Sequence, residues 1–258
     1  MESLKEFASE ILEDGVIDAE EVAKIKERIY ADGVIDAEEA DFLFELNDAV
    51  SGKENDSSWT ELFVEAISDY VLKDEKTPGV IDEDESNYLI SKIKSDGVVD
   101  ATELALLVNL SATSISVPDN FNEFVLDSLK TTIIEDGIVD EEEVEMMKKV
   151  VYASAGASGS DIDRMEANMI FDINDATSGK EGHHASWKPF FVEAISKHLL
   201  DDEASPNEID EDEGNWLIER IEGDGEYDNN EKALLSYIKE NAKKIDGKLK
   251  FKMDMFVS

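Results

Sequence analysis

Apolar residues recur at helical spacing through most of the chain. The clearest run follows the i, i+3, i+4, i+7 rule at Trp59, Leu62, Phe63, Ala66, Ile67, Tyr70 and Val71. The same spacing returns from Trp187 to Leu199. Apolar and polar residues alternate strictly only at residues 248–256, where we expect a short strand or a docked extended peptide. The pattern therefore predicts an all-α protein.

The periodicity predicts about six helices in each half of the chain. The predicted ranges are 2–13, 18–31, 36–50, 58–73, 82–95 and 100–112, and then 119–135, 140–153, 163–177, 186–200, 210–222 and 228–244. Short connections between consecutive helices favour antiparallel neighbours in a compact bundle.

The second half of the chain repeats the first. Residues 63–110 laid over residues 191–238 without a gap are identical at 26 of 48 positions. The helical periodicity is interrupted near 113–120, where Ser, Thr and Pro118 replace apolar residues. We therefore expect two tandem homologous helical bundles and a tail, with these bounds: 1–115, 119–245 and 246–258.

Acidic corners separate several of the predicted helices. Each has the order Asp-Gly-hydrophobic-hydrophobic-Asp with Glu three residues later, and a fifth copy at Asp224 is weaker. The copies are Asp14 to Asp18 with Glu21, Asp32 to Asp36 with Glu39, Asp96 to Asp100 with Glu103, Asp136 to Asp140 with Glu143, and Asp224 to Asp228 with Glu231.

Helix capping accounts for most of this pattern. The glycine suits a positive φ at a helix end, the second Asp is a good N-cap, and the Glu completes a capping box. Each cap contributes about 1 kcal/mol, which is enough to select these residues without a ligand. Capping leaves the first Asp of each corner unexplained.

A calcium loop of the EF-hand type is the alternative interpretation of the corners. With Gly15 at loop position 6, Asp14, Asp18 and Glu21 fall at positions 5, 9 and 12, but position 3 is Leu12. The corner at Gly97 would place Lys92 at position 1, which disfavours a cation. These corners therefore do not form complete cages.

The loop before the fifth predicted helix of each half, which we call the third corner, fits the calcium loop better. Residues 74–85 and 202–213 keep acidic residues at positions 1, 9 and 12, although positions 3 and 5 lack side-chain ligands. The predicted ligands are Asp74, Asp82 and Glu85, and then Asp202, Asp210 and Glu213. Because all of them offer oxygen atoms from flexible loops, we expect Ca²⁺, with Mg²⁺ as the less suitable ion.

Composition narrows the classes of partner. The chain has 64 Asp and Glu against 24 Lys and Arg, a formal charge of −40, so cations or a basic protein surface would offset its charge. A basic stripe for nucleic acid is lacking, and the chain has no cysteine for disulfides or thiolate metal sites. No apolar run approaches the length of a membrane span, and the N-terminus does not look like a signal peptide, so we expect a cytoplasmic protein.

No nucleophile with a matching base stands out, and we expect a protein that is not an enzyme. The pair His183 and His184 lies in a predicted loop, where solvated side chains are expected more than metal ligands. His198 takes the helix position of Tyr70 and is expected to be a hydrogen-bonded core residue.

The segments Ala31-Asp32-Gly33-Val34-Ile35-Asp36-Ala37-Glu38-Glu39 and Ser95-Asp96-Gly97-Val98-Val99-Asp100 resemble the tellurite-resistance TerB-like family. The resemblance implies a small helical bundle that works through divalent cations and protein partners in bacterial stress responses. By this likeness the residues of interest are Asp32, Glu39, Asp96, Glu103, Asp136, Glu143, Asp224 and Glu231. The second half departs from the pattern at residues 154–160, which replace the Asp-Gly step.

The sequence thus supports two hypotheses. The first is a non-enzymatic interaction module that binds divalent cations, calcium first, at its corners, and whose protein partner has a basic surface. The alternative is a purely electrostatic scaffold or nucleic-acid mimic that binds basic proteins without specific metal sites.

Overall fold

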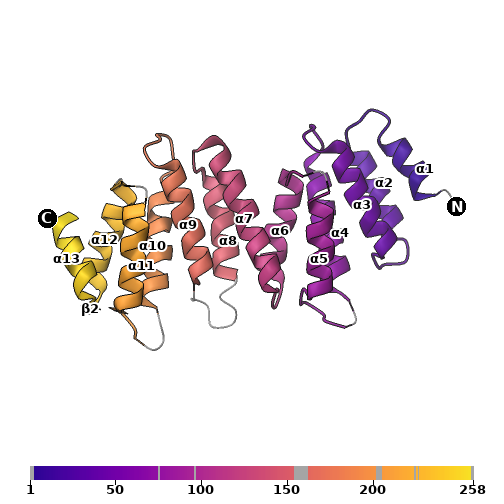
Figure 1. The fold of residues 1–258 in the computed structure, drawn as a ribbon. Helices are drawn as coiled ribbons and strands as arrows, with labels where there is room; N and C mark the ends of the chain where they lie inside the picture. The colour runs from indigo at the N-terminus through magenta and orange to yellow at the C-terminus, as the bar shows by residue number, and fades with distance from the viewer. Residues whose placement is uncertain are drawn as a thin grey trace. The chain divides into compact units, whose positions relative to one another are not determined.

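The computed structural model describes residues 3–74, 76–95, 97–153, 162–201, 205–223, 225 and 227–256. Over these residues the chain is mostly helical, which confirms the all-α prediction (Figure 1). The helices of the first part are α1 (Leu4–Ile11), α2 (Ala19–Ile29), α3 (Ala37–Val50), α4 (Ser57–Leu72), α5 (Glu83–Ile93) and α6 (Ala101–Thr113). The remaining elements are α7 (Asp119–Asp136), α8 (Glu141–Ala153), α9 (Arg164–Thr177), α10 (Trp187–Leu200), β1 (Glu208–Ile209), α11 (Glu211–Gly223), α12 (Asn229–Asn241), β2 (Lys244–Ile245) and α13 (Gly247–Phe256).

The chain forms two compact units, Met1–Val125 and Leu126–Ser258. In the first unit α4 is the central helix and packs against α2, α3 and α6. Its apolar face carries Trp59 and Phe63, both buried, and the ring of Phe44 meets Phe63 edge-on at 5.2 Å. Burial of this periodic face is the main source of stability for the helix, because isolated helices of this length are marginal in water.

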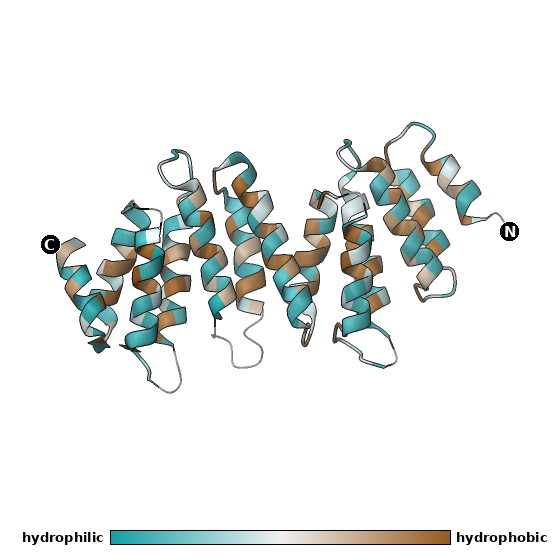
Figure 2. Ribbon diagram, in the orientation of Figure 1, coloured by the Kyte–Doolittle hydropathy of each residue, from teal (hydrophilic) through white to brown (hydrophobic). Residues whose placement is uncertain are grey.

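In the second unit α10 takes the central place and packs against α9 and α12. Trp187, Phe190 and Phe191 are buried along it, and Phe171 of α9 meets Phe191 edge-on at 5.1 Å. Apolar positions run along the helices of each unit as stripes, brown in Figure 2. No helix within the described ranges combines the length and apolar character needed to cross a membrane.

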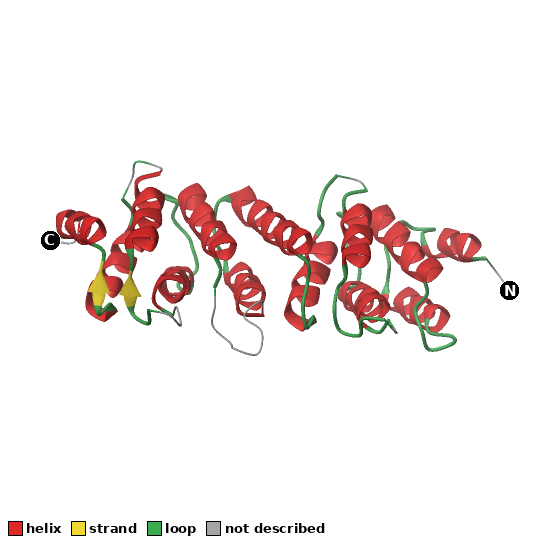
Figure 3. Ribbon diagram, turned by 60° about the horizontal axis from the view of Figure 1, so that its bottom comes forward, coloured by secondary structure: helices red, strands yellow, loops and turns green. Residues whose placement is uncertain are grey.

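A short parallel pairing joins each third corner to the segment that follows α6 in the first half and α12 in the second. In the second unit Glu208 pairs with Lys244 in the β1–β2 pair, drawn as yellow arrows in Figure 3. In the first unit an isolated parallel bridge joins Val80 to Ser116. The two pairings lie 128 residues apart in the sequence, at the same spacing as the aligned segments.

The C-terminal segment corrects the prediction of a strand or extended peptide at residues 248–256, because α13 is a helix. Asp246 Oδ2 accepts hydrogen bonds from the N–H groups of Lys248 and Leu249 and so caps its start. Leu249 and Met253 are buried one turn apart, whereas Phe251 and Met255 are exposed. The alternating residues therefore lie on two opposite helix faces, and packing on α11 and α12 selects the helix.

This packing predicts different effects for two neighbouring methionines. Met253→Ala should lower the free energy of unfolding by about 2 kcal/mol or more, because Met253 is 1% exposed and its removal leaves a cavity. Met255→Ala, at a position that is 61% exposed, should change it by less than about 0.5 kcal/mol. Equilibrium urea unfolding followed by circular dichroism measures both. Equal, small effects would contradict the packing of α13 through Met253.

Candidate functional site

In three of the corners the first Asp, which capping leaves unexplained, closes the turn itself. Oδ1 of Asp14 accepts a hydrogen bond from Val16 N–H at 3.1 Å, and Asp32 accepts from Val34 N–H at 3.1 Å. Asp136 does the same for Ile138 N–H at 2.8 Å. These are Asx turns, in which the side chain satisfies a backbone donor two residues on. Asp96 and Asp224 lie outside the described residues.

Every Glu proposed from sequence as a metal ligand closes a capping box. Its Oε2 accepts the backbone N–H of the Asp three residues earlier, and the distances are 2.9 to 3.0 Å. The residues concerned are Glu21, Glu39, Glu85, Glu103, Glu143, Glu213 and Glu231. In return, Oδ1 of Asp82 accepts a hydrogen bond from Glu85 N–H, and Oδ1 of Asp210 accepts one from Glu213 N–H. Capping is therefore a demonstrated role of these carboxylates.

Another Asp and Glu box, at the start of α9, was not predicted from the sequence. Asp163 caps α9, its Oδ1 accepts from Glu166 N–H at 2.8 Å, and Glu166 Oε2 accepts from Asp163 N–H at 2.9 Å. The signal for it was present as Asp and Glu three residues apart before an apolar run. It was obscured by the loss of the Asp-Gly step at 154–160, a segment that lies outside the described residues.

Lysines of the chain lie beside the first corner of each half. A methyl group placed on Gly15 would lie 3.3 Å from Lys53 Nζ, and one on Gly137 would lie 2.6 Å from Lys180 Nζ. Both glycines have positive φ, 82° and 73°, which closes the corner tightly. The ammonium groups thus supply positive charge to these corners from the protein itself.

The third corner of the first half gathers three carboxylates. Asp74 Oδ1 accepts from Thr77 N–H at 3.0 Å and Oδ2 from Lys76 N–H at 3.0 Å, which fixes its direction. Burial raises the pKa of Glu85, and the negative charges of Asp82 and Asp74 raise it further. The hydrogen bond from Asp82 N–H and the positive charge of Lys76 act in the opposite direction. Glu85 therefore interacts electrostatically with both aspartates of this loop.

The same corner of the second half keeps part of this geometry. Asn207, which stands where the first half has Gly79, adopts φ of 64°, as Gly79 does with φ of 79°. Its N–H donates to Leu200 O at 2.8 Å, as Gly79 N–H does to Leu72 O. Asp202 lies outside the described residues. Within the described ranges, no group of three or more His, Asp or Glu side chains is placed to hold a metal ion.

The histidines have hydrogen-bonding roles. His183 Nδ1 accepts from Val139 N–H at 3.0 Å, so its proton is on Nε2, 3.2 Å from Thr177 O. His198 Nδ1 lies 2.7 Å from Ile162 O, and Nε2 accepts from Arg164 Nε at 3.2 Å, which confirms the expected hydrogen-bonded histidine. Burial lowers the pKa of His198.

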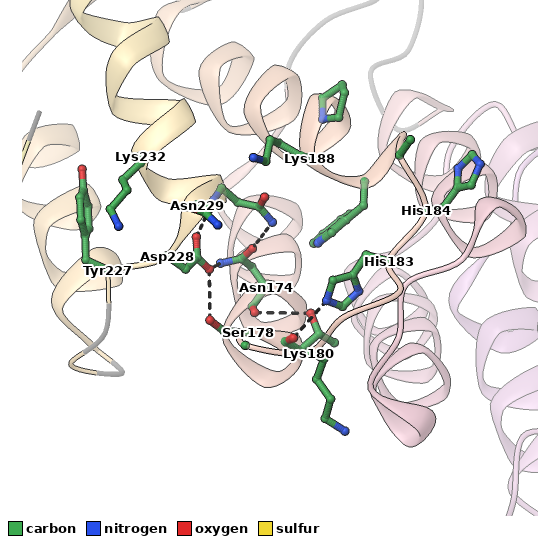
Figure 4. A pocket seen from close by; sticks show the side chains of 16 residues that line it. Asn174, Ser178, Lys180, His183, His184, Lys188, Tyr227, Asp228, Asn229 and Lys232 are labelled. Carbon is green, nitrogen blue, oxygen red and sulfur yellow. Dashed lines mark hydrogen bonds between the residues drawn. The ribbon is translucent and has the colours of Figure 1, made fainter.

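A hollow that sequence reasoning did not predict opens in the second unit. It has a volume of about 670 Å³ and lies between the end of α9 and the starts of α10 and α12 (Figure 4). None of the sixteen residues proposed as metal ligands lines it. Comparison of the chain with family models, curated proteins and solved structures found no match.

The corner at Asp136 predicts a pH dependence of stability. Burial is the main cause that raises the pKa of Glu143 to about 7, and the negative charges of Asp140, Asp136 and Glu142 also raise it. The hydrogen bond from Asp140 N–H lowers the pKa in part. The unfolded value is about 4.3, so the protonated form stabilises the fold fully below about pH 4.3, and this stabilisation is lost as pH rises through 7.

Glu143→Gln keeps the box and removes the charge, so it should remove this fall in stability. At pH 8 the variant should be more stable than the parent by about 1 kcal/mol, a value discounted for solvent screening, and at pH 4 the two should agree. Urea unfolding between pH 4 and 8 measures the difference. Glu145→Gln, an exposed change two residues further along the same helix, is the control and should follow the parent. Coincident profiles for all three proteins would contradict the assignment.

Proposed function

We propose that the protein is a non-enzymatic interaction module that binds a basic surface of a protein partner through exposed carboxylates of its first unit. The observation that supports this most directly is a stripe of acidic residues on one face of α3. The acidic stripe consists of Glu38, Asp41, Glu45 and Asp48.

The spacing of the acidic stripe, i, i+3, i+7 and i+10, places its members above one another on the helix. Glu38, Glu45 and Asp48 are exposed. Asp41 is held by Lys92 Nζ at 2.7 Å and by Tyr88 OH at 2.9 Å, and Asp48 Oδ2 accepts from Ser95 Oγ at 2.9 Å. These bonds orient two of the carboxylates, and Lys92 offsets the charge of Asp41.

The aligned face of the second unit differs in charge. Residues 46–49 (Leu-Asn-Asp-Ala) align with residues 173–176 (Ile-Asn-Asp-Ala), a shift of 127 residues. This shift pairs the stripe with Met165, Asn168, Asp172 and Asp175 on α9. Arg220 Nη2 bonds both acids, at 2.8 Å to Asp172 and 3.2 Å to Asp175. Residues 1–125 carry 32 acidic and nine basic side chains, whereas residues 126–258 carry 32 and 15. The first unit is therefore the stronger attractant for a basic partner.

Attraction of this kind steers association and gives specificity through complementary charge. It also weakens with salt, because the Debye length falls from about 10 Å at 0.1 M to about 3 Å at 1 M. The capping role of the corner carboxylates fits this proposal, since it leaves partner binding to exposed acids outside the boxes.

A defined basic probe tests the acidic stripe. The triple variant Glu38→Gln, Glu45→Gln, Asp48→Asn should bind a lysine-rich peptide at least tenfold more weakly than the parent, measured by isothermal titration at 0.1 M NaCl. The matched control removes three exposed charges elsewhere in the same unit, through Glu27→Gln, Glu54→Gln and Glu61→Gln. Equal losses in both variants would show that net charge alone acts, and would refute the stripe as the binding surface.

Calcium binding at the loop 74–85 is the second candidate function, since the negative charges of Asp82 and Asp74 add to the burial that raises the pKa of Glu85. A cation there would offset that repulsion. The TerB-like resemblance is compatible with both candidates. The roles it implies in a bacterial stress response, and the cytoplasmic location, stay predictions.

Calcium should raise the stability of the protein beyond the effect of ionic strength. At ten times its Kd the gain is about 1.4 kcal/mol, seen as a higher Tm in Ca²⁺ than in NaCl of matched ionic strength. Glu85→Gln retains the capping bond but loses the charge, so it should abolish the gain. Glu21→Gln, the same change in a different box, should keep it. Equal Tm values in both salts for the parent would exclude the site.

A further inference from the structure

The hollow in the second unit combines polar and apolar walls. Its lining includes Trp187 and Lys188 at the start of α10, and Tyr227, Asn229 and Lys232 at the start of α12. Its volume of about 670 Å³ lies within the range of pockets that take small organic ligands. All of these residues belong to one compact unit, so the walls are placed together by its fold.

A buried donor in this pocket lacks a partner. Trp187 is 1% exposed, and its Nε1 finds no hydrogen-bond acceptor in the part of the chain that the structure describes. The two other tryptophans differ: Trp59 Nε1 donates to Asn47 Oδ1 at 3.2 Å, and Trp216 Nε1 donates to Asn168 Oδ1 at 3.0 Å. A buried N–H group without an acceptor is costly and rare in folded proteins.

The missing bond coincides with substitutions between the two halves. In the first unit Thr102 Oγ1 lies 2.9 Å from Thr60 Oγ1, and Asn47 Oδ1 is left for the indole of Trp59. In the second unit Asn230 stands at the position of Thr102, and its Nδ2 donates to Asn174 Oδ1 at 2.8 Å. Asn174, the counterpart of Asn47, thus accepts from Asn230, and Trp187 Nε1 makes no hydrogen bond to it.

The same comparison shows where positive charge has been added. Lys188 stands at the position of Thr60, and Lys232 at the position of Leu104. Neither ammonium forms an ion pair with a described residue, and Lys232 Nζ lies 5.2 Å from the ring centre of Tyr227. In Figure 4 Lys188 and Lys232 lie on either side of Asn229, whereas Lys180 points away from this group.

The acid in the pocket wall is already satisfied. Asp228 Oδ1 accepts from the N–H groups of Asn230 and Glu231, and Oδ2 accepts from Asn174 Nδ2 at 2.7 Å and from Ser178 Oγ at 3.4 Å (Figure 4). These donors spread the negative charge of Asp228 over its surroundings. The donors that remain to bind a ligand are the ammonium groups of Lys188 and Lys232, the side-chain amide of Asn229 and the indole N–H of Trp187.

We propose that this pocket binds a small organic anion, whose carboxylate or phosphate group is held by Lys188 and Lys232 while one of its oxygen atoms accepts the Trp187 N–H. The donors suit an oxyanion because all are N–H groups and two are charged. The inference is independent of the proposed basic partner, since it concerns the other unit and the opposite charge.

The three tryptophans allow a test within one spectrum. In ¹⁵N-labelled protein, the indole N–H signal of Trp187, assigned with Trp187→Phe, should shift and saturate as inorganic phosphate is added in one arm and glutarate in another. The signals of Trp59 and Trp216 serve as internal references and should stay in place. A saturable shift with phosphate alone identifies a phosphate site, and one with glutarate alone a carboxylate site.

Two variants give pocket positions of the second unit the residue types found at the aligned positions of the first unit. Lys188→Thr with Lys232→Leu should weaken binding at least tenfold, whereas Lys149→Thr, an exposed lysine of α8 outside the pocket, should change it less than twofold. Asn230→Thr frees Asn174 Oδ1, so it should move the Trp187 signal without any ligand and weaken binding.

Three results would overturn the proposal. One is a Trp187 signal that moves in both arms no more than it does in NaCl of the same ionic strength. The second is a shift shared equally by all three indole signals. The third is an equal loss of affinity in the Lys149→Thr control. A spectrum of each variant without ligand checks that the protein is folded.

Discussion

The reciprocal bond between a helix-starting Asp and the Glu three residues later is the interaction on which this structure depends most. The first backbone N–H groups of a helix have no partner inside it, and a box satisfies two of them at once. Asp18 with Glu21 and Asp100 with Glu103 show the same bonds at 2.9 to 3.0 Å in different surroundings. With each cap worth about 1 kcal/mol, repeated boxes fix where the helices begin and how the chain turns between them.

Helix periodicity and capping rules predicted the features whose partners are close in the sequence. The helix Ser57–Leu72, the N-cap at Asp18 and the box at Glu21 follow from spacing alone, since every partner lies within one helical turn. The Asx turn at Asp14 was within reach of the same rules, because Asp commonly accepts from the N–H two residues on. The calcium hypothesis at these corners stays a prediction that capping makes unnecessary for explaining their composition.

Features that depend on tertiary packing were not predictable in this way. The segment after Asp246 alternates like a strand, yet Leu249 and Met253 are buried against α11 and α12, and this burial selects a helix. The pocket beside Trp187 was missed because each of its substitutions is unremarkable alone. A comparison of aligned positions, Thr60 with Lys188 and Leu104 with Lys232, would have indicated added charge at one place. The lost indole bond needs coordinates to be seen.

The parallel pairings have a consequence for how the chain opens. Ile115 N–H donates to Gly79 O and Ile81 N–H to Ser116 O, so the entrance of the α5–α6 hairpin is tied to its exit. The corresponding hydrogen bond in the second unit, from Lys243 N–H to Asn207 O, ties the two ends of the α11–α12 hairpin together. Because the entropy of closing such a loop grows only slowly with its length, a few bonds suffice to hold both ends. We therefore expect each hairpin to open as one cooperative segment, so that anything that braces the loop before α5 also restrains the end of α6.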